Sequence, residues 1–580
     1  MDERAKEALR IGDAEFGKKK KIDSLWQEIA LNFYPERADF TNERAEGDEY
    51  ADHLFSSFPV LARRELGNLF AANLRDRSNK WFSIHVDDEE LDEGDAERAF
   101  LESLTEIQWR LMYAKGTQFV RATKEADHDF AAFGNAVIWY GINSGGDGLL
   151  YRNYHLRDCA WSENADGEID CLHRNWEPTA RQLKQMFPTT VSEQVTRACE
   201  KDPQQIFKCR HVVMPSRLYH YKSKSGKQFP FIELFIERDT MTILSEIGLN
   251  YFPFVVPRWQ TVSGSVYGIS MATMTILPDG RTIQVMMRTL REAGEKYVDP
   301  PMIAIADAIR GDYALYAGGV TVADMEYDER LGEVLRPIAQ DRGGMPIGME
   351  LATALKEDIR SGFFLDKIIM NPVSGKEMTA FEFGNHLQQQ IRQTAPIFEP
   401  ITEGYSDPLC DGTFQLLMAN GAFPVQAMPP SIQGRDIKFK FRSPLAEMEE
   451  QRDAQIYGQV LTGIVTPAAQ VDPAQLEQVD LTVATRDAMR AAGWKQKWFK
   501  PLEAIEQRQQ QVAQEAELAK GMQMAEQMAN TVQKGGAGLA NSDKLMDAMG
   551  KAPAVAEGLG VGQGGGQAMA PELEDAGADG

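Results

Sequence analysis

The pattern of apolar and polar residues over 347–391 predicts two helices joined by a polar loop. The first helix carries an apolar stripe at intervals of three and four residues: Ala352, Leu355, Ile359 and Phe363. It is expected to end at Asn371, because Pro372 disfavours the helical conformation of the residue before it. Thr379 and Glu382 have the spacing of a capping box, so a second amphipathic helix is expected to follow.

The loop between these two helices, residues 371–378, has no core to join. We therefore expect it to lie on a surface or to line a cavity. An ordinary helical hairpin also explains this segment when it is taken alone. Its role depends on the rest of the chain.

Amphipathic helices are also predicted in the first third of the chain. Their apolar faces lie within residues 25–33, 61–74, 96–113 and 119–133. Between the second and third of these helices, Trp81 to Ile84 is expected to be extended.

From Ala136 the apolar period changes to that of strands. Strands are predicted at 137–142, 149–154, 211–221, 229–236 and 241–244. The first two flank a glycine-rich hairpin turn, and Asn164 to Gly167 marks a second turn. Thr179 and Gln182 predict a capped helix over 179–187. Residues 136–258 are thus expected to form a β-rich domain, as a small barrel or a sandwich.

After Trp259 the pattern becomes helical again and then mixed. One helix has its face at Ile283, Met286, Met287, Leu290 and Gly294. Pro300 and Pro301 end it, and a short mixed segment runs to Pro346. Later elements are a helix at 413–420, a strand at 437–441 and helices at 445–461, 473–491 and 501–534. The Gly- and Ala-rich acidic tail from Gly535 is expected to be disordered, and the fold class is α+β.

Length and composition are those of a large globular chain. With 580 residues and 43% hydrophobic content, it can bury several cores. No segment approaches the run of about 20 apolar residues that a membrane helix needs, and the charged residues 1–21 show no signal peptide. Five unevenly spread cysteines favour reduced thiols in a cytosolic setting over a disulfide framework.

The formal net charge of −24 argues against a protein that grips nucleic acid over a wide basic surface. Two basic clusters are nevertheless present: Lys18 to Lys21, and Arg435 with Lys438, Lys440 and Arg442. Both clusters are expected to lie on solvated faces.

Two glycine-rich segments only superficially match nucleotide-binding motifs. Gly12 to Lys19 approaches a phosphate-binding loop, but Lys19 stands where the magnesium-binding Ser or Thr belongs, and no strand precedes it. Gly560 to Gly565 has the letters of a dinucleotide fingerprint, but it lies in the low-complexity tail with no predicted strand or helix beside it. Neither segment indicates a cofactor.

Candidate metal and catalytic residues do not assemble into a site. Two strands could bring together four ligands for zinc: Cys171, His173, Cys209 and His211. The Cys-x-His spacing is unusual for a zinc site, however, and burial of these residues on one face of a strand explains the same alternation. A calcium loop is imitated by Asn164, Asp166, Glu168 and Asp170, but the bidentate Glu is missing and a hairpin turn is expected. His128, between Asp127 and Asp129, has no nucleophile to activate. The sequence thus predicts neither an enzyme nor a cofactor.

A series of distinct short motifs runs along residues 26–446. They are Trp26 to Ala30 with Tyr34-Pro35, Asp52 to Ser57, Trp81-Phe82, Phe254 to Trp259, Val266 to Ser270, Leu277 to Asp279, and Phe441 to Ala446. Together they resemble the head-to-tail connector, or portal, proteins of short-tailed bacteriophages. The chain departs from the pattern at Ser270-Met271, where a Ser-Pro pair is expected.

The resemblance implies a portal fold that forms a dodecameric ring around a central DNA channel. The implied regions are a wing over 1–262 (helical to 135, β-rich from 136), stem helices at 263–297 and 347–370, a clip at 298–346, a tunnel loop at 371–378, a long wing helix region at 379–430, a helical crown at 431–533 and a tail from 534. The β-rich, two-helix and helical patterns found independently agree with this order. The acidity also agrees, because many Lys or Arg contacts to phosphates would retain the DNA that must pass.

The residues that would meet DNA belong to the implied tunnel loop: Asn371, Val373, Ser374, Gly375 and Lys376. The implied partners are identical subunits, double-stranded DNA bound without sequence preference, capsid protein, scaffold, the terminase motor and tail adaptors, with no membrane. The implied location is the portal vertex of the virion, after assembly in the bacterial cytoplasm. The alternative function is a metal-dependent nucleic-acid enzyme.

Overall fold

The computed structural model describes most of the chain. The described residues are 2–45, 47–49, 51–77, 80–87, 94–143, 145–219, 228–298, 302–304, 335–337, 344–368, 397–441, 454, 456–467, 480–492, 494, 498–500 and 502–534. The chain divides into two compact units, Met1–Phe499 and Lys500–Gly580. Helices and several small antiparallel sheets make up the first unit, so the α+β class predicted from the sequence is confirmed.

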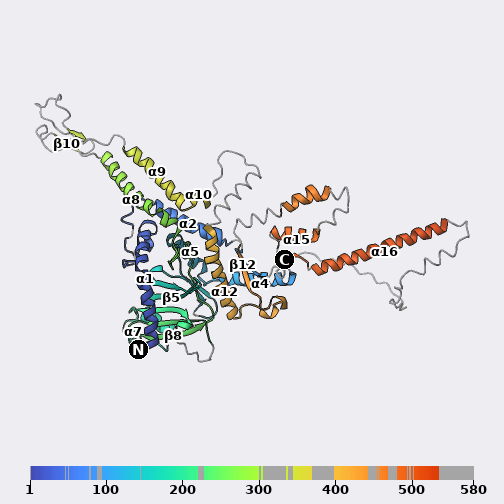
Figure 1. Cartoon of the computed structure of the whole chain (residues 1–580), viewed down its shortest axis with the longest axis horizontal. Coiled ribbons are helices and arrows are strands. Elements are labelled where there is room, and N and C mark those ends of the chain that lie inside the picture. Colours follow the sequence, from blue (N-terminus) through green and yellow to red (C-terminus); the bar gives the residue numbers. More distant parts are fainter. Residues whose placement is uncertain are drawn as a thin grey trace, which may run out of the picture. The chain divides into compact units, whose positions relative to one another are not determined.

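The described α-helices of the first unit carry the labels of Figure 1. They are α1 (Glu3–Phe33), α2 (Phe58–Leu74), α4 (Asp95–Met112), α5 (Phe119–Phe133), α6 (Ala180–Met186), α7 (Glu193–Lys201), α8 (Met271–Val298), α9 (Gly344–Gly362), α10 (Leu365–Ile368), α12 (Asp407–Ala419) and α15 (Leu481–Ala491). Two π-helical turns are η6 (Thr402–Ser406) and η9 (Leu461–Val465). The helices predicted at 61–74, 96–113 and 119–133 are confirmed by α2, α4 and α5.

The strands pair in antiparallel order within four sheets. They are β1 (Phe82–Val86), β2 (Ile138–Ile142), β3 (Leu149–Asn153), β4 (Cys159–Glu163), β5 (Ile169–Trp176), β6 (Cys209–Pro215), β7 (Phe231–Glu237), β8 (Thr242–Leu249), β9 (Phe254–Val255), β10 (Met302–Ala304), β11 (Leu335–Pro337) and β12 (Ile437–Phe441). The sheet orders are β4-β5-β6-β7-β8, β3-β2-β9, β1-β12 and β10-β11. The predicted hairpin around 143–148 is confirmed, because β2 pairs with β3 from Ile138 opposite Asn153 to Ile142 opposite Leu149.

The five-stranded sheet is an open meander, so the closed barrel that the strand pattern allowed is wrong. Its order leaves β4 and β8 at opposite edges. Helices cover its faces where a sandwich would place a second sheet. Small residues of α1 pack with Val212 and Leu234 on one face, and α6 and α7 pack with Cys209 and Leu244 on the other. Amphipathic helices thus bury the two faces of this open sheet.

α1 begins much earlier than the apolar pattern indicates. Asp2 caps it by accepting a hydrogen bond from the backbone N–H of Arg4. Gly12 lies inside the helix and against the sheet, where a Cβ would come within 2.6 Å of Nδ1 of His173. The segment that imitates a phosphate-binding loop is therefore an uninterrupted helix whose glycine allows close packing.

One lysine of the first basic cluster is buried, which corrects the expectation that Lys18 to Lys21 lies on a solvated face. The side chain of Lys19 is fully buried. Its ammonium donates to the carbonyls of Leu156 and Arg157 and pairs with Asp23 at 3.0 Å. The two carbonyls come from a turn more than a hundred residues away, so the local charge pattern could not reveal them. Arg435, Lys438 and Lys440 of the second cluster are exposed, as expected.

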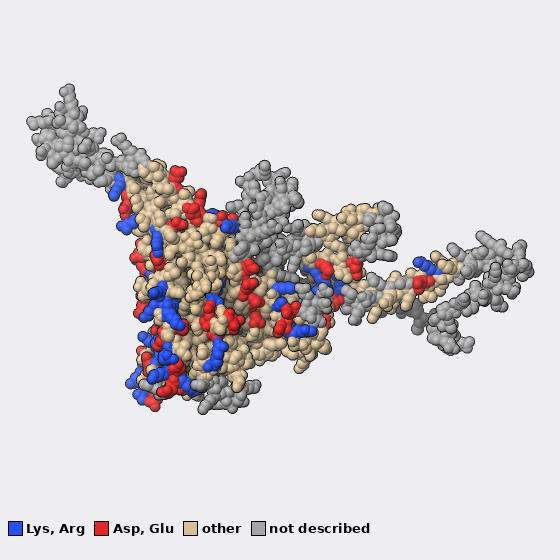
Figure 2. Space-filling model, viewed as in Figure 1, with Lys and Arg blue, Asp and Glu red and all other residues tan. Residues whose placement is uncertain are grey.

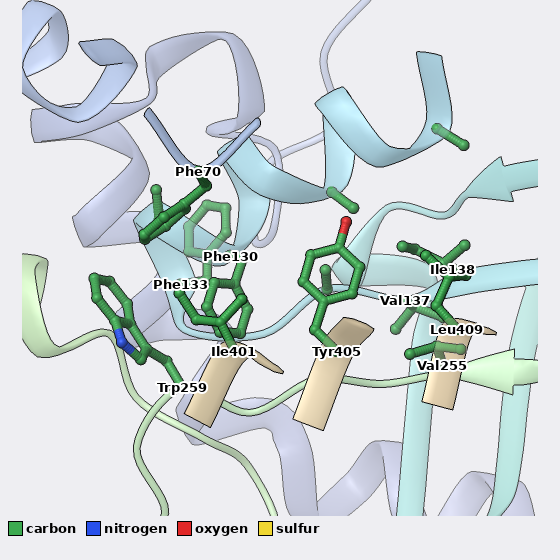
Figure 3. Close-up of a cluster of buried hydrophobic side chains, with 14 of the residues drawn as sticks. Phe70, Phe130, Phe133, Val137, Ile138, Val255, Trp259, Ile401, Tyr405 and Leu409 are labelled. Carbon is green, nitrogen blue, oxygen red and sulfur yellow. The ribbon is translucent and has the colours of Figure 1, made fainter. Parts of the chain in front are cut away.

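A large aromatic core joins the N-terminal helices to later segments of the chain (Figure 3). The ring of Trp259 stacks on Phe130 of α5 at 5.6 Å and meets Phe70 of α2 edge-on at 5.3 Å. Tyr405 of η6 lies against Phe130, and Leu409 of α12 is buried in the same cluster. Fully burying such side chains stabilises a fold by about 1.5–3 kcal/mol each. This core fixes where α8 begins and where α12 lies.

β1 and β12 form a two-stranded sheet from segments far apart in the chain. Phe82 pairs with Phe441, and Val86 pairs with Ile437. The sequence predicts both extended segments but gives no sign that they pair. Because β1 also packs against α4, the pairing places residues 437–441 in the same part of the fold as α4.

The helix predicted over 347–370 ends earlier than expected. α9 stops at Gly362, and Phe364 adopts a left-handed conformation with φ of 57° before the short helix α10. The break lets both phenylalanines pack, since Phe363 lies edge-on to Phe33 and Phe364 lies near Trp259. Gly362 is the last residue of α9 and lies against Ile276, whereas the left-handed residue after the helix is Phe364.

The second unit consists, in its described part, of one helix. α16 runs from Leu502 to Lys534 and confirms the helix predicted over 501–534. Its described side chains are mostly exposed. The predicted disordered tail from Gly535 lies outside the described residues.

Candidate functional site: the α8–α9 pair and the groove beside α12

The start of α8 is fixed to the end of α5 by buried hydrogen bonds. The Asn135 amide makes two bonds to the backbone of Gly268, accepting at 2.9 Å and donating at 2.7 Å. Ser270 caps α8 by accepting from the N–H of Thr273, and both side-chain hydroxyls donate to carbonyls at the end of α5. Ser270 is therefore the cap of this helix.

α8 and α9 run antiparallel and approach closely at glycines (Figure 1). A Cβ at Gly362 would lie 2.1 Å from Cγ2 of Ile276, and one at Gly348 would lie 2.8 Å from Cδ2 of Leu290. Gly280 of α8 likewise receives the ring of Phe33 from α1. These contacts fix how α8 and α9 align with each other. The start of α8 and the end of α9, called the base of the pair, lie in the main core.

A buried amide ties α8 to the loop before α2. Oε1 of Gln284 accepts from the backbone N–H groups of Phe55 and Ser56, both at 2.8 Å. Its Nε2 donates to the carbonyl of Ser56 at 2.9 Å. One side chain thus satisfies three backbone groups that would otherwise lose water on burial.

The half of the pair farther from the core is exposed and has balanced charge. Large apolar side chains lie in water there, including Val285, Ile347 and Leu351, which are 67%, 60% and 54% exposed. α8 and α9 together carry equal numbers of positive and negative side chains, whereas the whole chain has a net charge of −24. Such a surface offers phosphate little attraction.

The predicted tunnel-loop residues lie outside the described residues. Asn371, Val373, Ser374, Gly375 and Lys376 fall between Ile368, where the described chain stops, and residue 397, where it resumes. The predicted second helix from Thr379 falls there too. Within the predicted clip, the described strands β10 and β11 pair with each other, from Met302 opposite Pro337 to Ala304 opposite Leu335.

A groove of about 1150 Å³ opens between the two larger sheets and the helical run of η6 and α12. Its floor is aromatic: Phe231, Phe252 and Phe254 follow one another with ring centroids 5.5 and 5.8 Å apart. At the rim, Arg217 pairs with Asp170 at 2.7 Å. The opposite wall is different, because its acidic residues have no such partners.

Carboxylates recur every four residues along the helical wall of this groove: Glu399, Glu403, Asp407 and Asp411. Glu403 and Asp411 line the groove. Burial, followed by the negative charges of Asp411 and Glu403, raises the pKa of Asp407. Burial also raises the pKa of Asp411, which accepts a hydrogen bond from Gln415 at 2.7 Å. Among the described residues, no Lys or Arg offsets either shift.

The Cys and His residues considered for zinc do not come together. Across β5 and β6, His173 pairs with Val212, and Arg174 pairs with His211. Opposed residues share a face and successive residues alternate, so His173 and His211 lie on opposite faces of the sheet, each with its neighbouring cysteine. Burial, and then the charge of Arg210, lowers the pKa of His173 to about 3. His211 is held by Glu233 at 2.8 Å.

The remaining candidate residues have structural partners. The calcium-like segment is a hairpin turn, as expected, with Gly167 at φ of 83°. Beside His128, Asp127 pairs with the buried Arg75, and Asp129 pairs with Arg37 at 2.8 Å. In the described part of the chain, three or more His, Cys, Asp or Glu residues nowhere cluster as they would to hold a metal ion.

The acidic stripe of α12 was not recognised from the sequence. Its signal was present, since four acidic residues at intervals of four predict one charged helix face. The aromatic floor could not be recognised, because it is built from separate strands.

Comparison with known proteins decides the family. Residues 14–499 match the family described as bacteriophage head to tail connecting protein. The chain belongs to this family. It is 24% identical to a probable portal protein of Bordetella phage BPP-1 over 446 residues, which cover 73% of this chain and 76% of that protein. It is 22% identical to the portal protein of Salmonella phage epsilon15 over 368 residues, which cover 62% of this chain and 65% of that protein.

Head to tail connecting proteins are structural proteins, so the predicted family and the absence of an enzymatic role are both confirmed. The alternative of a metal-dependent nucleic-acid enzyme finds no support. A search of the described helices finds none with the length and hydropathy needed to cross a bilayer.

Proposed function

We propose that the chain is the portal subunit of a short-tailed bacteriophage and that identical copies close into a ring at one capsid vertex. The family match over residues 14–499 and the two portal proteins similar to the chain support this function. DNA enters the head during packaging and leaves during ejection through the central channel. The ring also provides the platform on which the packaging motor and the tail dock.

The antiparallel α8–α9 pair is the observation that carries the proposal. The chain leaves the core along α8, passes through residues 299–343, and returns to the same core along α9. In the proposed assignment these helices are the stem, residues 298–346 are the clip, and residues 371–378 are the tunnel loop. Residues 1–262 and 379–430 form the wing, and residues 431–533 form the crown.

Charge supports passage of DNA rather than its retention. The charges of α8 and α9 balance and the whole chain is acidic, so neither has a net positive charge to hold phosphates. Each phosphate neutralised by Lys or Arg adds salt-dependent affinity, which would slow transport. A single Lys376 per subunit would give the channel a ring of weak, sequence-independent contacts.

The proposed assembly has twelve copies and acts in the virion, after assembly in the bacterial cytoplasm. Its further partners are capsid protein, scaffold, the terminase motor and tail adaptors. The partners other than DNA would each meet a different surface of the ring, which a chain of this size with several cores can supply.

Deleting Val373 to Lys376 tests the proposed DNA channel. We expect ring assembly to persist while packaged DNA per particle falls, measured by quantitative PCR on nuclease-treated particles. Truncation after Lys534 is the control, because residues 535–580 are rich in Gly and Ala and hold no aromatic side chain, so their loss should leave the ring and packaging intact. Unchanged DNA content and particle yield in the loop deletion would contradict the proposal.

A further inference from the structure

The groove beside α12 combines an apolar floor with an acidic helical wall. Its two lining arginines, Arg217 and Arg258, pair with Asp170 and Glu163, and among the described residues no Lys or Arg pairs with Glu403 or Asp411. Its aromatic floor can hold the aliphatic part of a long side chain, while Glu403 and Asp411 can hold a positive end. Like charges at intervals of four residues on one helix destabilise it. Burial, and then the negative charges of Asp411 and Glu403, raises the pKa of Asp407. An incoming cation would relieve this repulsion.

Exposed lysines of α1 are suited to supply that cation. Lys18 is paired with Glu15 at 2.8 Å and Lys19 is buried, whereas Lys20 and Lys21 are exposed. Lys20 and Lys21 have no ion pair with any described residue. The cluster of four lysines thus leaves two long cationic side chains free to reach another molecule.

The two surfaces lie on different sides of one unit. α1 packs against α2, α5, α8 and β4, whereas α12 packs against α4, β2 and β12. In Figure 1 the two helices lie apart, and Figure 2 shows Lys and Arg side chains intermixed with Asp and Glu side chains along the edge that α1 forms. A contact between two different surfaces is heterologous, and repetition of such a contact builds a ring when its rotation closes.

We propose that the groove beside α12 receives Lys20 and Lys21 of a second copy of the chain. The ammonium groups pair with Glu403 and Asp411 of the groove and with the exposed Asp407 beside it, and the aliphatic stems lie on the aromatic floor. This inference rests on the proposed function, since it names the contact between neighbouring subunits of the ring.

Electrostatics favours a second copy as the occupant. Each copy carries a net charge of −24, so copies repel one another at long range unless surfaces of opposite charge meet. Exposed Lys20 and Lys21 facing the acidic wall of the groove provide such a local pairing of opposite charges. It also fixes the order of contact, because groove against groove or lysine against lysine is repulsive.

Charge reversal on each surface, and then on both, tests the contact. The variants of the full-length chain are E403K/D407K, K20E/K21E and the combination of all four changes. The control E177K/E200K makes the same change of charge at exposed residues outside the groove. Assembly is measured by mass photometry over a dilution series at 0.15 M salt, and circular dichroism reports folding.

We expect each single-surface variant to raise the concentration needed for ring assembly at least tenfold, and the four-fold variant to return within threefold of wild type. The control should assemble like wild type. Wild-type assembly in both single-surface variants, or failure of the four-fold variant to recover while folded, would overturn the inference. If the wild-type chain itself formed no ring, the proposed function would fail instead, so the two failures are distinguishable.

Discussion

The two ends of the α8–α9 pair differ in what surrounds them. At the base, Ile276, Ile283 and Phe363 are buried and Gln284 satisfies three backbone groups. Toward the far end, Ile347 and Leu351 are mostly exposed. Two helices alone can bury only the faces that they turn to each other. The base therefore holds the fold, and the far end is available for other molecules.

Phe363→Ala should have the largest effect on the base. The substitution removes a fully buried ring that lies edge-on to Phe33, and such truncations cost about 3–5 kcal/mol. Hydrogen exchange should show a loss of this size in the opening free energy of α9 amides. Leu351→Ala at the far end is the matched control and should change it by less than about 0.5 kcal/mol. Equal effects at both positions would remove the distinction between the two ends.

Gln284→Ala should follow in size. It leaves two N–H groups and one carbonyl without their partner, at a cost of about 2–3 kcal/mol. Gln284→Glu keeps the two acceptor contacts but cannot donate to Ser56, so its loss should be smaller. Protection of the amides of Phe55 and Ser56 from exchange is the measurement. Retained protection in the alanine variant would show that the amide clamp does not hold the loop.

Two glycines of α9, Gly348 and Gly362, sharpen the comparison. Gly362→Ala brings a Cβ to 2.1 Å from the branched Ile276 in the base, and such overpacking costs about 1–3 kcal/mol. Gly348→Ala meets only the flexible end of Leu290 at 2.8 Å, and helix propensity favours alanine by about 0.5–1 kcal/mol. Thermal unfolding should therefore place the first variant below wild type and the second at or above it. The reverse order would be inconsistent with the described packing.

Ile347→Ser with Leu351→Ser should have the smallest effect on folding. Both side chains are exposed in the single chain, so the expected change is within about 0.5 kcal/mol. If the far end lies between copies in the proposed ring, the same variant should assemble only at higher concentration. Unchanged folding together with unchanged assembly would leave the stem without a role in contacts between copies.

Local signals allowed much of the fold to be predicted. The capping box of Thr179 and Gln182 is present in α6, and the glycine-rich hairpin after β2 has the expected pairing. These features depend on residues within a few positions of each other. The overall order of helical and β-rich segments was predictable for the same reason.

Features that depend on distant partners were not predictable. Lys19 can be buried because the carbonyls of Leu156 and Arg157 accept hydrogen bonds from its ammonium group. Likewise, β1 is a sheet strand because β12 pairs with it. The groove likewise needs two sheets and a helix to come together. The early end of α9 was not predictable either, because the apolar stripe through Phe363 suggested continuation, and the break depends on packing of Phe363 and Phe364 against the distant Phe33 and Trp259.

The mass and symmetry of purified full-length particles test the central claim most directly. Light scattering combined with negative-stain images down the symmetry axis should show a closed ring of about twelve copies around an open channel, as expected for a heterologous interface that closes. Only monomers or dimers over a wide range of concentration and salt would contradict the account.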